Sequence, residues 1–438
     1  MARTDIARPA VFRPGAPGEG LEVISLANGL RIVLDPMPGL ESTALGMWIQ
    51  AGARDEAAPI NGVAHLFEHM AFKGAGTRDA RAFAEAIESV GGSANAGTGF
   101  ERTAYYARSL AEHSGASLHL LADMLLEPHW SKAELEKEKG VVIQEIHEAF
   151  DSAEDRVFEL HQRLLFPDQP LGRPILGKAE TLAQIRVETL REFKQAFMAP
   201  SAMVLSVAGR FEAGEVLDIA EQRFGAMPAR QRPPTLPARP GAGLLVEARR
   251  AEQAHLVFSW PAPALGHCDV MSARLLGEIL GGGMASRLFQ EVREQLGLAY
   301  SIDAFLDLYQ DVGRLLVTAG CAVKDVGQVA DLCAAALLDL AENGPSEREL
   351  ARARVMVAAQ VLMGAESAAA RAEVRAGHML TLGALVPFET LKAQIRSVTG
   401  PMVRARAQEA VSGQACAAAL GPGQAVTRAL RGFCPRFG

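Results

Sequence analysis

Apolar residues recur with a period of two in some short stretches of the chain and with helical spacing in longer ones. The stretch LEVISLANGLRIVLD predicts two strands joined at Asn28-Gly29, because Asn-Gly is the preferred pair for a two-residue hairpin turn. The same periodicities predict the remaining elements of the first half. Strands are expected at about 43–53, 93–98, 103–108 and 202–209, and helices at about 62–73, 79–90, 110–126, 131–165 and 181–196, with a further helix ending near 224.

The order of elements repeats after residues 226–242, a Pro-rich stretch without periodicity that is typical of a linker. S-x-x-E capping boxes begin at Ser131 and at Ser346, each after a helix and a Pro-containing break. The sequence therefore predicts an α+β fold of two homologous domains, each a mainly antiparallel sheet covered by helices. The expected division is an arm at 1–20, a first domain at 21–225, the linker, and a second domain at 243–438, with strands near 243–248, 253–259, 299–307 and 312–320 and helices near 268–281, 285–296 and 324–342.

Bulk composition excludes several classes of partner. The chain has 438 residues and a formal net charge of −7, so we expect no general attraction to nucleic acid or to an anionic membrane. No apolar run approaches the roughly 18 residues of a membrane span. The five cysteines contain no C-x-x-C pair, so they indicate neither a disulfide framework nor a thiolate metal site. We expect a cytoplasmic protein; a periplasmic one stays open if a signal peptide was removed.

The pentapeptide HLFEH carries the first candidate chemistry. His65, Glu68 and His69 fall at positions i, i+3 and i+4, so all three project from one helical face. Two imidazoles one turn apart can bind a single zinc ion, and Glu68 beside them suits holding the proton of a water molecule. H-x-x-E-H is the reverse of the H-E-x-x-H order found on metalloprotease helices, and it uses the same face geometry. The alternative is a helix whose two histidines are merely solvated or hydrogen-bonded in the core.

A catalytic zinc site needs a third protein ligand, and SKAELEKEKGVVIQEIHEAF offers two carboxylates. Glu138 and Glu145 are seven residues apart, so they share one face of the predicted helix. Glu145 has apolar neighbours, and a buried carboxylate is costly unless it is paired or bound to metal. Glu138 has a more charged context, which suits a residue that supports a ligand from behind.

The repeat provides an internal comparison. The Ser346 box lies a fixed number of residues after the Ser131 box. When positions in the first copy are shifted along the sequence by that same number of residues, Glu138 falls on Ala353 and Glu145 falls on Gln360. Aligning HLFEH with residues 275–279 keeps only its glutamate, at Glu278. A residue needed only for packing should survive in both copies. The charged residues that occur only in the first copy therefore indicate a catalytic role for that copy, and the second copy is degenerate.

The chain resembles the pitrilysin/insulinase family of zinc peptidases, the inverzincins, and specifically the half-length bacterial members related to the mitochondrial processing peptidase β subunit. The resemblance covers nearly the whole chain. It implies one Zn²⁺ per chain, bound by His65, His69 and Glu145, with Glu68 as general base and Glu138 as a supporting catalytic residue. It is carried by GVAHLFEHMAFKG, ELEKEKGVVIQEI, GGSANAGTGFERTAYYARSL and GGGMASRLFQEVREQLGLAYS.

Two substrate-binding elements are also implied by the resemblance. A strand containing Asn95 and Ala96 matches the family's edge strand, on which a substrate peptide docks as an added strand. Arg293 and Tyr300 match a pair that contacts substrate and helps to polarise the scissile carbonyl. The alternatives are a turn residue for Asn95, a helix-surface arginine and a strand tyrosine.

The resemblance implies a zinc metalloendopeptidase that hydrolyses peptides or unfolded segments by a zinc-activated water with Glu68 as general base. Full-length relatives enclose a chamber with four such domains, so two chains are expected to form a dimer, with Arg293 and Tyr300 completing the partner subunit's site. The dimer could be a homodimer or a heterodimer with a motif-less paralogue. The alternative function is a non-catalytic scaffold or assembly subunit. Such members are expected to have lost zinc ligands, whereas every ligand is present here.

Overall fold

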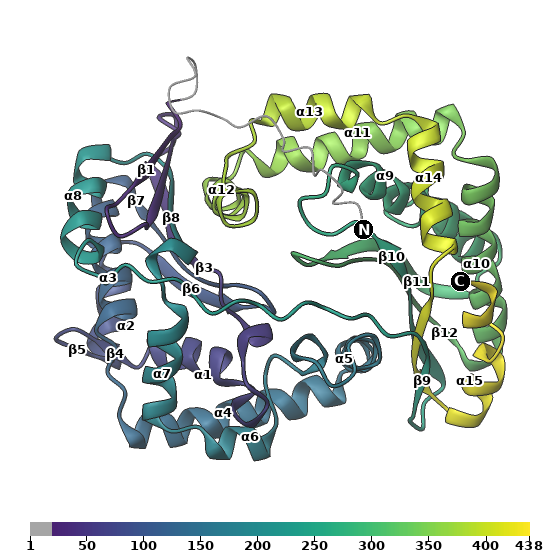
Figure 1. Ribbon diagram of the computed structural model, residues 1–438, viewed down its shortest axis with the longest axis horizontal. Coiled ribbons are helices and arrows are strands. Elements are labelled where there is room, and N and C mark those ends of the chain that lie inside the picture. The colour runs from purple at the N-terminus through teal and green to yellow at the C-terminus, as the bar shows by residue number, and fades with distance from the viewer. Residues whose placement is uncertain (1–19) are drawn as a thin grey trace.

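The computed structural model describes residues 20–438 and contains two large sheets, one in each half of the chain (Figure 1). Residues of both halves line a cleft between them. We call residues 20–225 the first half and residues 243–438 the second half. The predicted fold class is confirmed, because each sheet is mainly antiparallel and is covered by helices. The arm predicted at 1–20 lies outside the described residues except for Gly20. Within residues 20–438, no helix combines the length and apolar character needed to cross a membrane.

The first sheet has six strands in the order β1-β2-β8-β3-β7-β6, and only β2 and β8 run parallel. The predicted Asn28-Gly29 turn joins β1 to β2, and Gly29 has a φ of 95°, which glycine adopts without strain. The last strand, β6, forms one edge. The strands are β1 Glu22–Ser25, β2 Arg31–Pro36, β3 Ser42–Ile49, β6 Ser93–Thr98, β7 Thr103–Leu110 and β8 Met203–Gly209; the helices are α1 Val63–Ala71, α2 Ala80–Ser89, α3 Ser114–Leu126, α4 Lys132–Asp151, α5 Ala153–Leu165, α6 Ala179–Gln184, α7 Val187–Phe197 and α8 Ala213–Phe224, and β4 Gly74–Ala75 and β5 Arg78–Asp79 form a short separate ribbon.

The second sheet has the order β11-β12-β10-β13-β9, and only β13 and β9 run parallel. Residues 226–242, predicted as a linker, contain no helix or strand. The strands are β9 Gly243–Ala248, β10 Gln253–Ala262, β11 Ala299–Leu308, β12 Gly313–Ala322 and β13 Cys416–Gly421; the helices are α9 Val270–Leu280, α10 Val326–Asn343, α11 Glu347–Gly364, α12 Ala368–Leu382, α13 Phe388–Ser397, α14 Gly400–Val411 and α15 Gly423–Leu430.

Three predicted helices differ from the structure. The helix expected at 131–165 is two helices, because Ser152 adopts an extended conformation and its hydroxyl accepts a hydrogen bond from the backbone N–H of Asp155. The helix expected at 181–196 is likewise divided into α6 and α7 by extended backbone at 185–186. The helix expected at 285–296 is reduced to a π-helical segment, Phe289–Gln295.

The two halves exchange one helix each. Helix α5 packs on β13, β10 and β9 of the second sheet, and α12 packs on β8, β3 and β2 of the first (Figure 1). The starts of the two helices are separated by the same interval as the two capping boxes, and each helix follows a serine N-cap, Ser152 or Ser367. Buried side chains of α5, such as Leu160, join a cluster with Val257 and Leu420, so the exchange ties the two halves together.

Candidate metal centre

Helix α1 holds HLFEH between the core and the cleft. Leu66 and Met70 are fully buried, whereas His65, Glu68 and His69 are only partly buried. This follows the 3.6-residue period, which places the apolar side chains in the core and the two histidines toward Glu138 and Glu145 of α4. The predicted common face of the three polar residues is therefore present.

The start of α1 is held by a buried carboxylate that the sequence reasoning missed. Glu56 is 3% exposed and accepts hydrogen bonds from the backbone N–H groups of Gly62 and Ala64, both at 2.8 Å, and from Asn61 Nδ2 at 2.7 Å. Burial raises the pKa of Glu56 to about 7, against the lowering effect of these donors. The first turn of a helix leaves N–H groups without intrahelical partners, so Glu56 satisfies donors directly before His65.

Three predicted ligands converge. Glu145 Oε2 lies 3.8 Å from His65 Nε2 and 3.5 Å from His69 Nε2. The potential ligand atoms of the three residues all lie within 4.8 Å of one another. A tetrahedral zinc ion with bonds of about 2.0–2.1 Å places neighbouring ligand atoms roughly 3.3 Å apart, so this donor set fits zinc after small side-chain adjustments.

The proton positions also suit a metal. Glu138 Oε2 lies 3.1 Å from His69 Nδ1, so this carboxylate favours the tautomer of His69 that donates from Nδ1 and has a lone pair on Nε2. Glu138 is buried and also pairs with Lys73 Nζ at 2.8 Å. Burial, and then the charge of His69, lowers the pKa of His65 to about 4, and its buried Nδ1 has no partner among the described residues. His65 is therefore neutral near pH 7, the form that binds metal.

Glu68 lies at the end of the edge strand β6. The hydroxyl of Thr98, the last residue of β6, donates a hydrogen bond to Glu68 Oε2. Burial raises the pKa of Glu68, while the Thr98 hydrogen bond lowers it. Thr98 was missed as a site residue because nothing in the sequence indicates which residue of SANAGT meets the helix.

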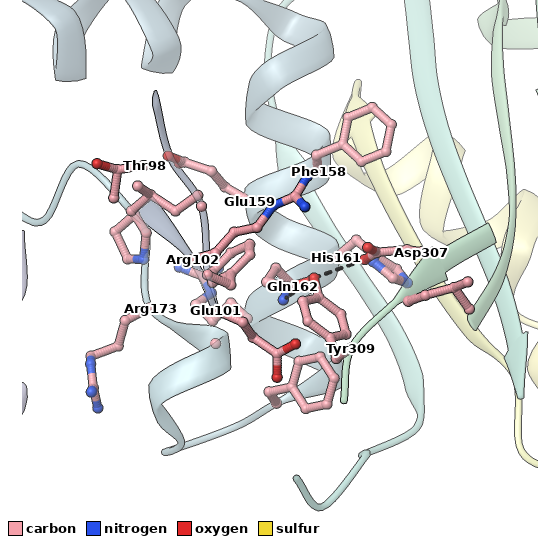
Figure 2. Close-up of a pocket in the computed structure, with 18 of the residues that line it drawn as sticks. Thr98, Glu101, Arg102, Phe158, Glu159, His161, Gln162, Arg173, Asp307 and Tyr309 are labelled. Carbon is pink, nitrogen blue, oxygen red and sulfur yellow. Dashed lines mark hydrogen bonds between the residues drawn. The ribbon is translucent and has the colours of Figure 1, made fainter. Parts of the chain in front are cut away.

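His65, Glu68, Gly97 and Thr98 line a cavity of about 1520 Å³ between the halves. The opposite wall comes from α5 and from the end of β11, and Figure 2 shows its side chains. There, Gln162 Nε2 donates to the Tyr309 hydroxyl at 3.0 Å, which in turn donates to Asp307 at 2.8 Å. The cavity is large enough for an extended peptide segment.

The predicted substrate-binding residues fall in two places. Asn95 is exposed on β6, its side-chain oxygen accepting from Ala96 N, and Ala96 is 9% exposed and faces the core. β6 is thus an edge strand beside the site, as expected. Arg293 and Tyr300 are exposed, Tyr300 by 50%, and neither lines the cavity. The structure does not bring this pair to the metal ligands of the same chain, and their roles stay predictions.

The counterpart of HLFEH in α9 differs by one residue from the expected alignment. In α1, His65 and His69 interrupt a run of buried residues, and in α9 Arg274 and Glu278 interrupt it at the same spacing. Glu278 is hydrogen-bonded to Gln360, just as His69 faces Glu145. Glu278 therefore stands in the position of His69, and the alignment with residues 275–279 was wrong because it matched residue identity instead of the face toward α11. Gly277 replaces Glu68. The second half therefore keeps none of the four candidate site residues, His65, Glu68, His69 and Glu145.

Comparison with known families decides the relationship. Residues 31–179 match the family described as Insulinase (Peptidase family M16), and residues 184–357 match the Peptidase M16 inactive domain. The chain belongs to the insulinase family. The second match includes α9, in which His65, Glu68 and His69 are replaced by Arg274, Gly277 and Glu278.

Relatives in the insulinase family span almost the full chain. An uncharacterized zinc protease, YmxG, of Bacillus subtilis is 34% identical over 384 residues, covering 87% of this chain and 93% of the relative. An uncharacterized zinc protease of Rickettsia felis is 31% identical and covers 95% and 100%. A protease from Helicobacter pylori has the same fold, with a TM-score of 0.84 at 20% identity over 92% of this chain and 100% of that chain. A Pseudomonas fluorescens structure described as a peptidase M16 inactive domain also gives 0.84, at 21% identity over 92% and 98%.

Proposed function

We propose that the protein is a zinc-dependent endopeptidase that hydrolyses peptides or unfolded segments. The observation that carries this proposal is the convergence of His65, His69 and Glu145 beside Glu68, at the wall of a cavity large enough for a peptide. A zinc ion held by these three residues would supply Lewis-acid chemistry for amide hydrolysis. Family membership and the zinc protease names of the relatives support a metallopeptidase.

The side chains of this chain would divide the remaining work. Glu68 would take a proton from the attacking water and return it to the leaving amine, which is the two-way role of a general acid–base. Thr98 would hold the Glu68 carboxylate, and Glu138 would hold the His69 ring in the tautomer that leaves Nε2 free. The unpaired edge of β6, with Asn95 and Ala96, would accept the substrate as an added strand.

We further propose that residues 21–225 are the catalytic domain and that residues 243–438, after the linker, are its degenerate copy. Arg293 and Tyr300 are exposed on the second half and away from the ligands of their own chain. This supports a dimer in which they complete the partner subunit's site and close a chamber. A homodimer and a heterodimer with a motif-less paralogue both satisfy this arrangement.

The test is hydrolysis of an internally quenched peptide by the purified protein. The proposal predicts cleavage that Glu68→Gln abolishes while the variant stays folded and retains bound zinc, because Glu68 is not a ligand. Glu85→Gln, an exposed acid on α2, is the control and should leave cleavage unchanged. An intact protein that carries no zinc and cleaves no peptide would instead indicate the scaffold role.

A further inference from the structure

Arg274 occupies, in the second half, the position that His65 occupies in the first. Both side chains point out of otherwise buried helices toward a cavity, and the helices lie at equivalent places beside their sheets. Arg274 lines the 1520 Å³ cavity that contains His65 and Glu68, and it also lines a second cavity, of about 1180 Å³, on the second half. A cation therefore stands where the two cavities meet.

The guanidinium of Arg274 has no ion pair or side-chain hydrogen bond to any other residue within 20–438. It is exposed to solvent inside the cleft, yet the surrounding protein lowers its pKa by desolvation. The other arginines that line the second cavity are engaged in ion pairs: Arg102 pairs with Glu373, and Arg371 pairs with Asp35.

Two other acids line the second cavity. Glu278, one turn along α9 from Arg274, is hydrogen-bonded to Gln360, and Asp303 lies on the edge strand β11. Neither forms an ion pair with Arg274. The planar guanidinium therefore keeps its donors available, and its preferred ligand is a carboxylate bound by two parallel hydrogen bonds.

We propose that Arg274 binds a carboxylate of the peptide that occupies the cleft, and so selects among substrates. This rests on the proposed peptidase function, because it assumes that the ligand is a peptide. The carboxylate can come from the free C-terminus or from an acidic side chain. A charge-assisted hydrogen bond of this kind predicts a preference of about 10- to 100-fold for the carboxylate form.

The experiment compares two pairs of internally quenched peptides on the full-length protein. The first pair has no acidic residue and ends in a free acid or an amide. The second pair is amidated and carries one internal Glu or Gln. The proposal predicts at least a tenfold higher kcat/KM for the carboxylate member of one pair, expressed mainly in KM, since the contact is remote from the reacting bond. The pair that shows the preference identifies the source of the carboxylate.

Arg274→Gln should remove this preference and leave cleavage of the uncharged peptides unchanged, while Arg274→Lys should keep part of it. Arg163→Gln is the matched control, because Arg163 is an exposed arginine that lines the other wall of the first cavity. No preference in the parent protein, a preference that survives Arg274→Gln, or an equal loss in Arg163→Gln would overturn the proposal.

The Arg274 site can still be tested if the peptidase proposal fails. If no peptide is cleaved, fluorescence anisotropy with the same peptides measures binding directly. Selective binding of the carboxylate forms that Arg274→Gln abolishes would support the Arg274 site although the peptidase proposal had failed. Equal binding of both members of each pair would overturn it.

Discussion

Arg371 on α12 forms an ion pair with Asp35 on β2, so a helix of the second half is fastened to the sheet of the first. The reciprocal contact is Arg156 on α5 with Glu247 on β9, at 2.6 Å. Arg156 and Arg371 are each the fourth residue of their helix, so they hold equivalent positions in the two halves. The two halves are thus joined by an arginine–carboxylate contact at equivalent positions, and Asp35 additionally pairs with the fully buried Arg375 at 3.0 Å.

The two contacts should differ in strength. Asp35 is fully buried, whereas the side chain of Glu247 is 25% exposed. Removing one partner of a buried pair leaves a desolvated charge, so Asp35→Ala should lower the free energy of unfolding by about 3–5 kcal/mol. Glu247→Ala should cost about 1 kcal/mol or less, since water replaces the lost partner. Chemical denaturation measures both, and equal losses would contradict the interpretation.

Glu56 should stabilise the start of α1. Glu56→Ala leaves the N–H groups of Gly62 and Ala64 and the amide of Asn61 buried without an acceptor, so the free energy of unfolding should fall by about 1–3 kcal/mol. Because these donors directly precede His65, zinc affinity should fall as well. Glu41→Ala, at an exposed ion pair, is the control for both measurements. Unchanged stability and unchanged zinc affinity in Glu56→Ala would show that Glu56 does not hold the helix.

Thr98 should affect turnover without affecting the metal. Thr98→Val keeps the shape of the side chain but removes the hydroxyl that donates to Glu68, so kcat should fall by about tenfold, equivalent to roughly 1.4 kcal/mol. Thr98→Ser retains the donor and should restore most of the activity. Zinc content should stay the same in both variants. A Thr98→Ser variant as impaired as Thr98→Val would assign the effect to packing.

His161 should make the protein sensitive to acid. It is a buried residue of α5 whose Nε2 lies 2.7 Å from Ser259 Oγ on β10, and burial, then the charge of Arg314, lowers its pKa to about 3. Between pH 6.5 and 3 the unfolded chain binds a proton at this residue and the folded protein does not. The stability is therefore fully present above pH 6.5 and falls with decreasing pH by up to about 1.4 kcal/mol per pH unit.

His161→Gln removes this proton uptake, so its free energy of unfolding should decline less steeply between pH 6.5 and 4 than that of the parent protein. Glutamine can still hydrogen-bond Ser259, which limits the loss of packing. His147→Gln, on the exposed face of α4, should leave the pH dependence unchanged. Parallel curves for His161→Gln and the parent would contradict the assignment.

The sequence predicted the local elements and the side chains that converge as a candidate metal site, because both depend on short, regular spacing. HLFEH and the seven-residue interval from Glu138 to Glu145 fix which side chains share a helical face, and the structure brings these faces together. Ser152 marks a limit, since its cap divides a continuous helical pattern.

Contacts between distant segments could not be predicted. Nothing local indicates that Thr98 meets Glu68, that Glu56 binds the start of α1, or that α5 and α12 change places between the sheets. The alignment of HLFEH with residues 275–279 of α9 was wrong for the same reason. Only the burial pattern and the contact of Glu278 with Gln360 show which residue of α9 corresponds to His69.

Zinc content, measured by mass spectrometry after exhaustive dialysis, tests the central claim most directly. We predict one zinc ion per chain in the parent protein, a strong loss in His65→Ala and Glu145→Gln, and full retention in Glu148→Gln, an exposed acid on the same helix as Glu145. A folded Glu145→Gln variant that retains zinc as tightly as the parent, or a parent protein that binds none when zinc is supplied, would contradict the account.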